Sequence, residues 1–131
     1  MIVVDSSVWI ANLRNLDTAA VQSLRAVIDD GKEQVLVGDL ILLEVLQGAH
    51  NEGHAARIEG NLRRFRVVPI LDDKLAVQAA RNYRMLRGIG VTIRKTIDVV
   101  IGTFCIVGGH SLLHDDRDFD PMAKHLGLQV A

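Results

Sequence analysis

The first nine residues, Met1-Ile-Val-Val-Asp-Ser-Ser-Val-Trp9, give the clearest indication of how this chain folds. Residues 2–4 are three consecutive aliphatic residues, the pattern of a short central strand of a parallel sheet, which is apolar on both faces. Asp5 follows the strand directly, and then Ser6 or Ser7 can cap a helix. In open α/β sheets the chemistry gathers beyond the carboxyl ends of the strands, so Asp5 stands where a functional carboxylate is expected.

The rest of the chain alternates strands and helices in the same way. Further strands are predicted at 35–37, 67–70, 110–114 and 128–130, and helices at about 18–30, 40–48, 51–65, 73–86, 97–107 and 120–126. We expect Asp39 and Thr96 to cap two of these helices, and Pro69 to confine its strand to an edge or a strand end. The alternation predicts a single domain, residues 1–131, with a three-layer α/β/α sandwich around a short, mainly parallel sheet.

Helical spacing also predicts which faces are buried. The helix at 40–48 is apolar nearly all round, so we expect it to be buried and Glu44 to be a costly carboxylate within it. In the helix at 73–86, the inward residues are predicted to be Leu75, Ala76, Ala79, Ala80, Tyr83 and Leu86, with Arg81 and Arg84 outward.

Composition bounds the class of protein. The chain has 131 residues, 49% of them hydrophobic, a net charge of −1 and one cysteine, Cys105. It lacks an apolar run long enough for a membrane span and a basic, apolar leader, so we expect a cytoplasmic protein. Residues 57–95 hold ten of the fifteen Lys and Arg residues against three acids, a basic band that could face a polyanion or simply solvent.

Five acids lie where they are costly or at strand ends. They are Asp5, Glu44, Asp98, Asp116 and Asp118. Asp5 and the acids at 115–118 both follow apolar strands, so they should share one edge of the sheet. Two unit charges about 4 Å apart repel by about 4 kcal/mol at an effective dielectric near 20, so such a cluster needs protons or a divalent cation. Oxygen ligands without His or Cys favour Mg²⁺ or Mn²⁺.

The ordered set of motifs resembles a known family. Asp5-Ser-Ser after a strand, Glu44 in a Leu-rich helix, Asp98 in Ile97-Asp-Val-Val-Ile-Gly and the segment His114-Asp-Asp-Arg-Asp-Phe119 look like the four motifs of PIN-domain ribonucleases. The short chain and the Asp-Arg-Asp-Phe ending look most like the VapC toxins of type II toxin–antitoxin modules. The resemblance covers the whole chain.

This resemblance implies a Mg²⁺- or Mn²⁺-dependent endoribonuclease that hydrolyses RNA, such as tRNA, with metal-activated water, and that is inhibited by a VapB-type antitoxin. Carried over by position, Asp5, Asp98, Asp116 and Asp118 would hold metal, and Glu44 would bind a second ion or position water. Ser7 matches the family's hydroxyl beside the first Asp, and Arg94 and Lys95 could meet substrate phosphates. The resemblance and the apolar helices also suggest a homodimer.

Two other functions are compatible with an acidic residue at the end of a strand. Phosphotransfer through an aspartyl intermediate at Asp5 usually requires a second Asp two residues on, where Ser7 stands. A catalytically silent PIN-fold binding partner would be expected to lack one or two of the acids, and this chain retains them all. His50 and His54, four residues apart, do not form a zincin motif and are interpreted as surface residues.

Overall fold

A computed structural model describes residues 1–131, and its centre is a parallel sheet with the strand order β3-β2-β1-β4-β5. The strands are short and match the predicted positions within a few residues: β1 (Ile2–Val4), β2 (Val35–Gly38), β3 (Arg66–Val68), β4 (Ser111–Leu113) and β5 (Gln129–Val130). All four strand pairings are parallel. β3 is an edge strand that ends just before Pro69, as its proline predicted.

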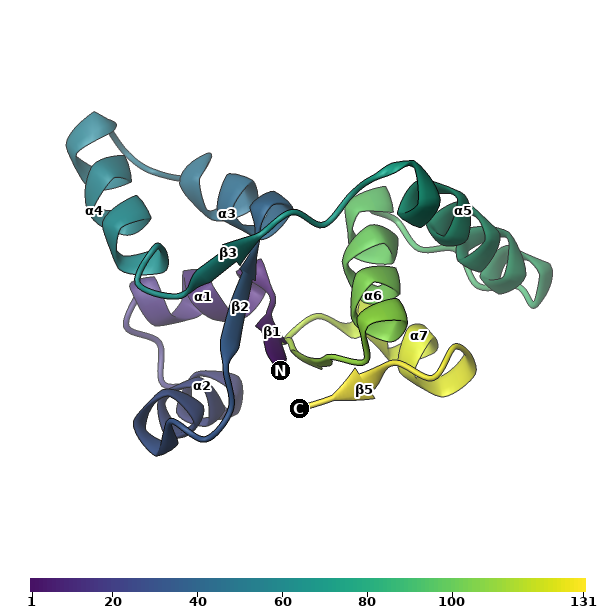
Figure 1. Cartoon of the computed structure of the whole chain (residues 1–131), viewed down its shortest axis with the longest axis horizontal. Coiled ribbons are helices and arrows are strands. Elements are labelled where there is room, and N and C mark those ends of the chain that lie inside the picture. The colour runs from purple at the N-terminus through teal and green to yellow at the C-terminus, as the bar shows by residue number, and fades with distance from the viewer.

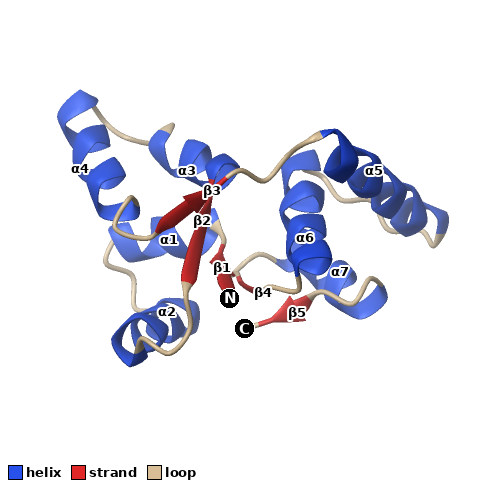
Figure 2. Cartoon of the chain, viewed as in Figure 1, coloured by secondary structure: helices blue, strands red, loops and turns tan.

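Helices cover both faces of this sheet (Figures 1 and 2). They are α1 (Ser6–Leu13), α2 (Ala19–Asp30), α3 (Asp39–Leu46), α4 (Glu52–Leu62), α5 (Asp73–Gly88), α6 (Thr96–Gly108) and α7 (Asp120–His125), with a 3₁₀ turn, η1 (Arg117–Phe119). The chain steps outward from β1 to β3 and then returns past β1 to β4. Since parallel crossovers are right-handed, this reversal places α1–α4 on one face and α5–α7 on the other, which is the predicted three-layer sandwich.

The reversal of strand order falls between β1 and β4, and this is where the acids gather. Val4 pairs with Leu113, and the backbone N–H of Asp5 donates to the Leu113 carbonyl at 2.9 Å. The carboxyl ends of the two strands therefore lie side by side. In doubly wound sheets such a topological switch point is the usual place for a ligand or an active site.

The helix α3 differs from the expectation that it is buried on all sides. Its buried side chains are Ile41 and Val45, whereas Leu43 is 54% exposed and Glu44 is half-buried. The helix packs on β2, α1 and α4, so its other leucines are partly buried against the core and only Leu43 faces solvent. Glu44 is therefore less deeply buried than the sequence suggested.

The inward face of α5 also differs from the prediction. Ala76 and Ala80 are exposed, and Tyr83 is half-buried, at an open groove of about 450 Å³ beside α6. The buried positions are Leu75, Ala79, Asn82 and Leu86. Asn82 is inside because its amide donates a 3.0 Å hydrogen bond to the Thr103 hydroxyl of α6, a partner that helical periodicity cannot reveal.

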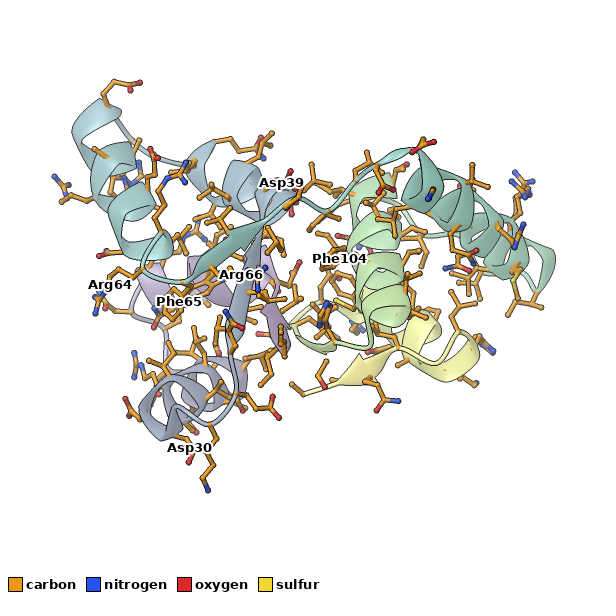
Figure 3. All side chains as sticks on the ribbon, viewed as in Figure 1. Asp30, Asp39, Arg64, Phe65, Arg66 and Phe104 are labelled. Carbon is orange, nitrogen blue, oxygen red and sulfur yellow. The ribbon has the colours of Figure 1, made fainter.

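Three helix caps are not the residues that the sequence suggested. Asp5, rather than Ser6 or Ser7, caps α1, and Gly38 and Lys95 take the cap positions of α3 and α6. Asp39 is the first residue of α3, and its carboxylate accepts hydrogen bonds from the N–H groups of Leu40 and Ile70. Figure 3 shows Asp39 where α3 begins, beside the chain that leaves β3.

One hydrophobic core extends through the sheet and the faces of both helical layers. Val3, Val4 and Val37 are fully inaccessible on the sheet, and Phe119 and Met122 close the side formed by η1 and α7. Gly102 of α6 permits this closure, since a Cβ there would overlap the end of the Met122 side chain. None of the helices combines the length and apolarity needed to cross a membrane.

Candidate functional site

Asp5 occupies the junction between β1 and α1 and is only 3% exposed. As the cap of α1, its Oδ2 accepts hydrogen bonds from the Ser7 N–H at 3.0 Å and from the Ser7 hydroxyl at 2.6 Å. Its other oxygen, Oδ1, is buried with no hydrogen-bond partner. A buried carboxylate oxygen without a partner is costly, so this atom marks a position where a ligand is expected.

The loop after β4 brings Asp116 and Asp118 to the same edge. The Asp116 N–H donates to His114 Nδ1 at 3.2 Å, and the Asp118 N–H donates to Asp116 Oδ1 at 2.9 Å. Ser7 connects this loop to Asp5, because its hydroxyl also accepts a hydrogen bond from the Asp115 N–H at 3.1 Å. Ser7 thus fixes the ends of β1 and β4 relative to each other.

Asp98 completes the tightest group of acids. It lies in the first turn of α6 and is 3% exposed, and its Oδ2 has no hydrogen-bond partner. One carboxylate oxygen from each of Asp98, Asp116 and Asp118 lies within 4.8 Å of the others. Asp118 Oδ2 is likewise buried and without a hydrogen bond. Asp5 lies beside this group but is not one of the three.

Glu44 reaches the cluster from α3. Its Oε1 accepts a 3.2 Å hydrogen bond from the Ser6 hydroxyl, which orients it toward the start of α1. Burial and the charge of Asp5 raise the pKa of Glu44, against the opposing influence of Ser6 and Lys95. Ser6 and His114 are therefore positioning residues, a role that the sequence, which offered Ser6 as a helix cap and His114 as part of the last motif, did not assign to them. The only sequence signal was their position next to the acids. We name Asp5, Glu44, Asp98, Asp116 and Asp118 the acidic site.

Burial and neighbouring negative charges disfavour the ionised form of Asp98 in the acidic site. Burial, followed by the charge of Asp5, raises the pKa of Asp98 from 3.8 to about 7. Near neutral pH this carboxylate is thus divided between its protonated and ionised forms. A cation that binds the ionised form would compete with the proton, as expected for a metal ligand.

Two basic residues from the loop between α5 and α6 lie against these acids. Arg94 Nε is 3.6 Å from Asp118 Oδ2, and Lys95 Nζ is 3.8 Å from Asp116 Oδ2. Both distances are longer than a hydrogen bond, so the contacts are ion pairs without directional bonding. Arg94 and Lys95 are thus brought to the site, as the sequence suggested.

The histidine pair His50 and His54 and the single cysteine, Cys105, make no hydrogen bond or ion pair with the acids. His50 and His54 stack on each other with ring centroids 4.9 Å apart at the start of α4, where the His50 N–H donates to His54 Nδ1. Cys105 is fully buried, and burial, with a smaller effect of the Asp5 charge, raises its pKa to about 12. Such a thiol is not a nucleophile at neutral pH.

The chain is similar to known proteins both in sequence and in fold, over nearly its whole length. The family model described as the PIN domain matches residues 2–125. VapC ribonuclease Mb1587 of Mycobacterium bovis and ribonuclease VapC11 of Mycobacterium tuberculosis are each 30% identical to it, across 100% of this chain and 98% of the relative. Among solved structures, VapBC2 from Rickettsia felis, bound to a promoter DNA fragment, has the same fold, with a TM-score of 0.78 at 12% identity, covering 100% of this chain and 98% of the other.

Proposed function

The chain belongs to the VapC group of the PIN-domain family, and from this membership we propose that it is a divalent-metal-dependent endoribonuclease, the toxin of a toxin–antitoxin pair. The observation that carries the proposal is the set of three buried carboxylate oxygens without hydrogen-bond partners, on Asp5, Asp98 and Asp118, of which only the Asp118 oxygen has an ion-pair partner, the exposed Arg94. Buried anions persist in proteins when they are paired or coordinate a metal.

The residues of the acidic site fit a hard cation. Every candidate metal ligand is a carboxylate oxygen, the type that Mg²⁺ and Mn²⁺ prefer, and neither His nor Cys is among them. Asp98, Asp116 and Asp118 would hold the ion, with Asp5 beside them, because these three present oxygens within 4.8 Å of one another. When bound, such an ion supplies positive charge that activates water and stabilises the oxygen that leaves the phosphate.

The other side chains of the site would position water, hold Asp5 and bind the phosphates of the substrate. Glu44 is outside the group of three and is held by Ser6, so it is positioned to orient water or to help hold a second ion. Ser7 keeps Asp5 in place by donating to its Oδ2. Arg94 and Lys95 are largely exposed at the edge of the site, where they can bind the phosphates of an RNA strand.

The proposed partners follow from the relatives. A solved structure from Klebsiella pneumoniae with a TM-score of 0.71 at 18% identity is described as a toxin–antitoxin complex, and together with the VapC relatives it supports a VapB-type antitoxin for this chain. The proposed substrate is structured RNA such as tRNA, and the proposed compartment is the cytoplasm. Exposed apolar side chains on and beside α5, including Val77, Met85 and Ile89, support a homodimer. A light-scattering mass near 14 kDa at micromolar concentration would contradict the dimer.

The deciding experiment is cleavage of total RNA by the purified protein with Mg²⁺ or Mn²⁺ and with EDTA. We expect cleavage only with the cation, and none by Asp98→Asn, which changes one acid of the site to an isosteric amide. Asp120→Asn is the matched control, because Asp120 is an exposed acid at the start of α7. Cleavage by folded Asp98→Asn at the wild-type rate would remove this residue from the mechanism.

The alternatives predict other outcomes. A phosphotransfer enzyme would form a base-labile phosphate on Asp5 when given a phosphoryl donor, whereas Ser7 here engages the Asp5 carboxylate by a hydrogen bond. A silent binding partner would have no reason to bind Mg²⁺ or Mn²⁺ in a calorimetric titration.

A further inference from the structure

The loop between α5 and α6 delivers a positive charge to the oxygens that the proposed metal would require. Lys95 Nζ lies 3.8 Å from Asp116 Oδ2, on the residue that immediately precedes α6. The Lys95 side chain is 57% exposed, whereas that of Asp116 is 24% exposed. The ammonium group can therefore leave the carboxylate by rotating its own side chain, without opening the core.

The influence of Lys95 extends beyond its nearest partner. Burial and Asp5 raise the pKa values of Asp98 and Glu44, and Lys95 opposes both shifts. Its charge therefore acts on acids from α3, from α6 and from the loop after β4. Arg94 makes a second, more exposed contact with Asp118, 3.6 Å from Oδ2.

We propose that Lys95 is a displaceable counter-ion of the acidic site, which competes with the divalent cation for Asp116 and, once displaced, is available to a phosphate of the RNA. This inference rests on the proposed function and adds an order to it: metal binding favours RNA binding through Lys95. Two cations cannot share one carboxylate oxygen at close range without repulsion. Because Lys95 sits at the mouth of the site, the substrate backbone is the next anion within its reach.

Because Lys95 competes with the cation for Asp116, removing it should strengthen metal binding. Because Lys95 also links the metal to RNA, its removal should reduce the factor by which each ligand raises the affinity for the other. This pattern separates a competing cation from a side chain that only supports the fold, since loss of support would weaken both. The expected change is modest, because exposed ion pairs are weak: about two- to fivefold in the dissociation constant for Mn²⁺.

The chain offers a matched control. Arg117 lies between Asp116 and Asp118 in the sequence, is exposed and makes no ion pair with either of them. Arg117→Gln changes the net charge next to the acids by the same amount as Lys95→Gln without removing an ion pair. Lys95→Arg keeps the charge and tests whether a cation at this position suffices.

The experiment is a calorimetric titration of the full chain with Mn²⁺, after treatment with EDTA and dialysis. We expect Lys95→Gln to bind Mn²⁺ about two- to fivefold more tightly than wild type and than Arg117→Gln, with Lys95→Arg close to wild type. In a second measurement, fluorescence anisotropy reports the binding of a short single-stranded DNA with and without Mn²⁺. This DNA serves as a probe that carries backbone phosphates but is not cleaved. The Mn²⁺-dependent gain in affinity should be smaller in Lys95→Gln than in Arg117→Gln.

The outcomes separate this inference from the proposed function. If wild type binds Mn²⁺ and Lys95→Gln binds it no more tightly than Arg117→Gln does, Lys95 is not a competitor and only the inference fails. If wild type binds no Mn²⁺ at all, the metal site and the inference fail together. Circular-dichroism melts of each variant verify that the exposed substitutions leave the fold intact.

Discussion

The Ser7 hydroxyl and the backbone N–H of Asp115 are 3.1 Å apart, although 108 positions separate them in the chain. The same hydroxyl donates to Asp5 Oδ2 at 2.6 Å. One small side chain therefore ties the residue after β1 to the loop after β4, across the switch point of the sheet. The connection thus joins the two segments that carry Asp5 and Asp116.

Replacing Ser7 by alanine should loosen the acidic site without unfolding the domain. It removes one of two hydrogen bonds to Asp5 Oδ2 and leaves the Asp115 N–H without its acceptor. We expect a loss of about 1 to 2 kcal/mol in the free energy of unfolding and about tenfold weaker Mn²⁺ binding. Urea unfolding and calorimetry measure the two effects.

Two further variants interpret that result. Ser7→Thr retains the hydroxyl and should bind Mn²⁺ nearly as wild type does. Ser23→Ala, an exposed serine of α2, should change neither quantity. If Ser7→Ala binds Mn²⁺ as tightly as wild type, the connection through Ser7 does not position the acids.

The stability of the protein in EDTA should fall as the pH rises. Burial and the charge of Asp5 raise the pKa of Asp98 to about 7 in the folded chain, from 3.8 in the ordinary carboxyl. Between these values the folded state binds more protons than the unfolded state, so the free energy of unfolding decreases with increasing pH and levels off above about 7. Thermal melts at pH 5 and pH 8 should therefore show the lower melting temperature at pH 8.

Asp98→Asn isolates this effect, because the amide does not titrate. We expect the variant to be more stable than wild type at pH 8 in EDTA and to lose part of the pH dependence. Mn²⁺ should stabilise wild type more at pH 8 than at pH 5, since the acids must be ionised to bind it. Equal pH dependence in wild type and Asp98→Asn would show that this carboxyl is not the strained group.

The convergence of the acids could be predicted from the sequence because it follows from topology. Parallel strands end at one edge, so Asp5 and the acids after β4 had to meet there, and the Val4–Leu113 pairing places them side by side. The inward face of α5 could not be predicted in the same way. Its alanines fit on either side of a helix, and Asn82 is buried through a hydrogen bond to a residue 21 positions later.

The cap of α1 shows a second limit of sequence reasoning. Asp5 is both an acid of the site and the cap of α1. The two serines that the sequence offers as caps use their hydroxyls otherwise: that of Ser7 donates to Asp5, and that of Ser6 donates to Glu44. Side-chain preference alone ranks Ser and Asp almost equally at this position. The choice between them depends on tertiary contacts with α3 and with the loop after β4.

The hydrogen bond between Asn82 and Thr103 should contribute to the docking of α5 on α6. Both side chains are buried, so Thr103→Val leaves the Asn82 amide without its acceptor and should cost about 1 to 3 kcal/mol. The double variant Asn82→Leu with Thr103→Val removes both polar groups and should recover much of that loss. Urea unfolding of the single and double variants measures the coupling. Additive losses would show that the two side chains do not act as a pair.

Glu44 should be required for RNA cleavage but not for Mn²⁺ binding. Asp98, Asp116 and Asp118 form the compact group of oxygens, and Glu44 reaches the site from another helix through Ser6. Glu44→Gln keeps an oxygen that can accept the Ser6 hydrogen bond and removes only the charge. We expect RNA cleavage to fall by about 10²-fold, as when a group that positions or deprotonates water is lost, while Mn²⁺ still binds.

Asp116→Asn is the contrasting variant, because it should lose both RNA cleavage and Mn²⁺ binding. Glu44→Gln would contradict this division of roles if it cleaved RNA at the wild-type rate, or if it lost Mn²⁺ as completely as Asp116→Asn does.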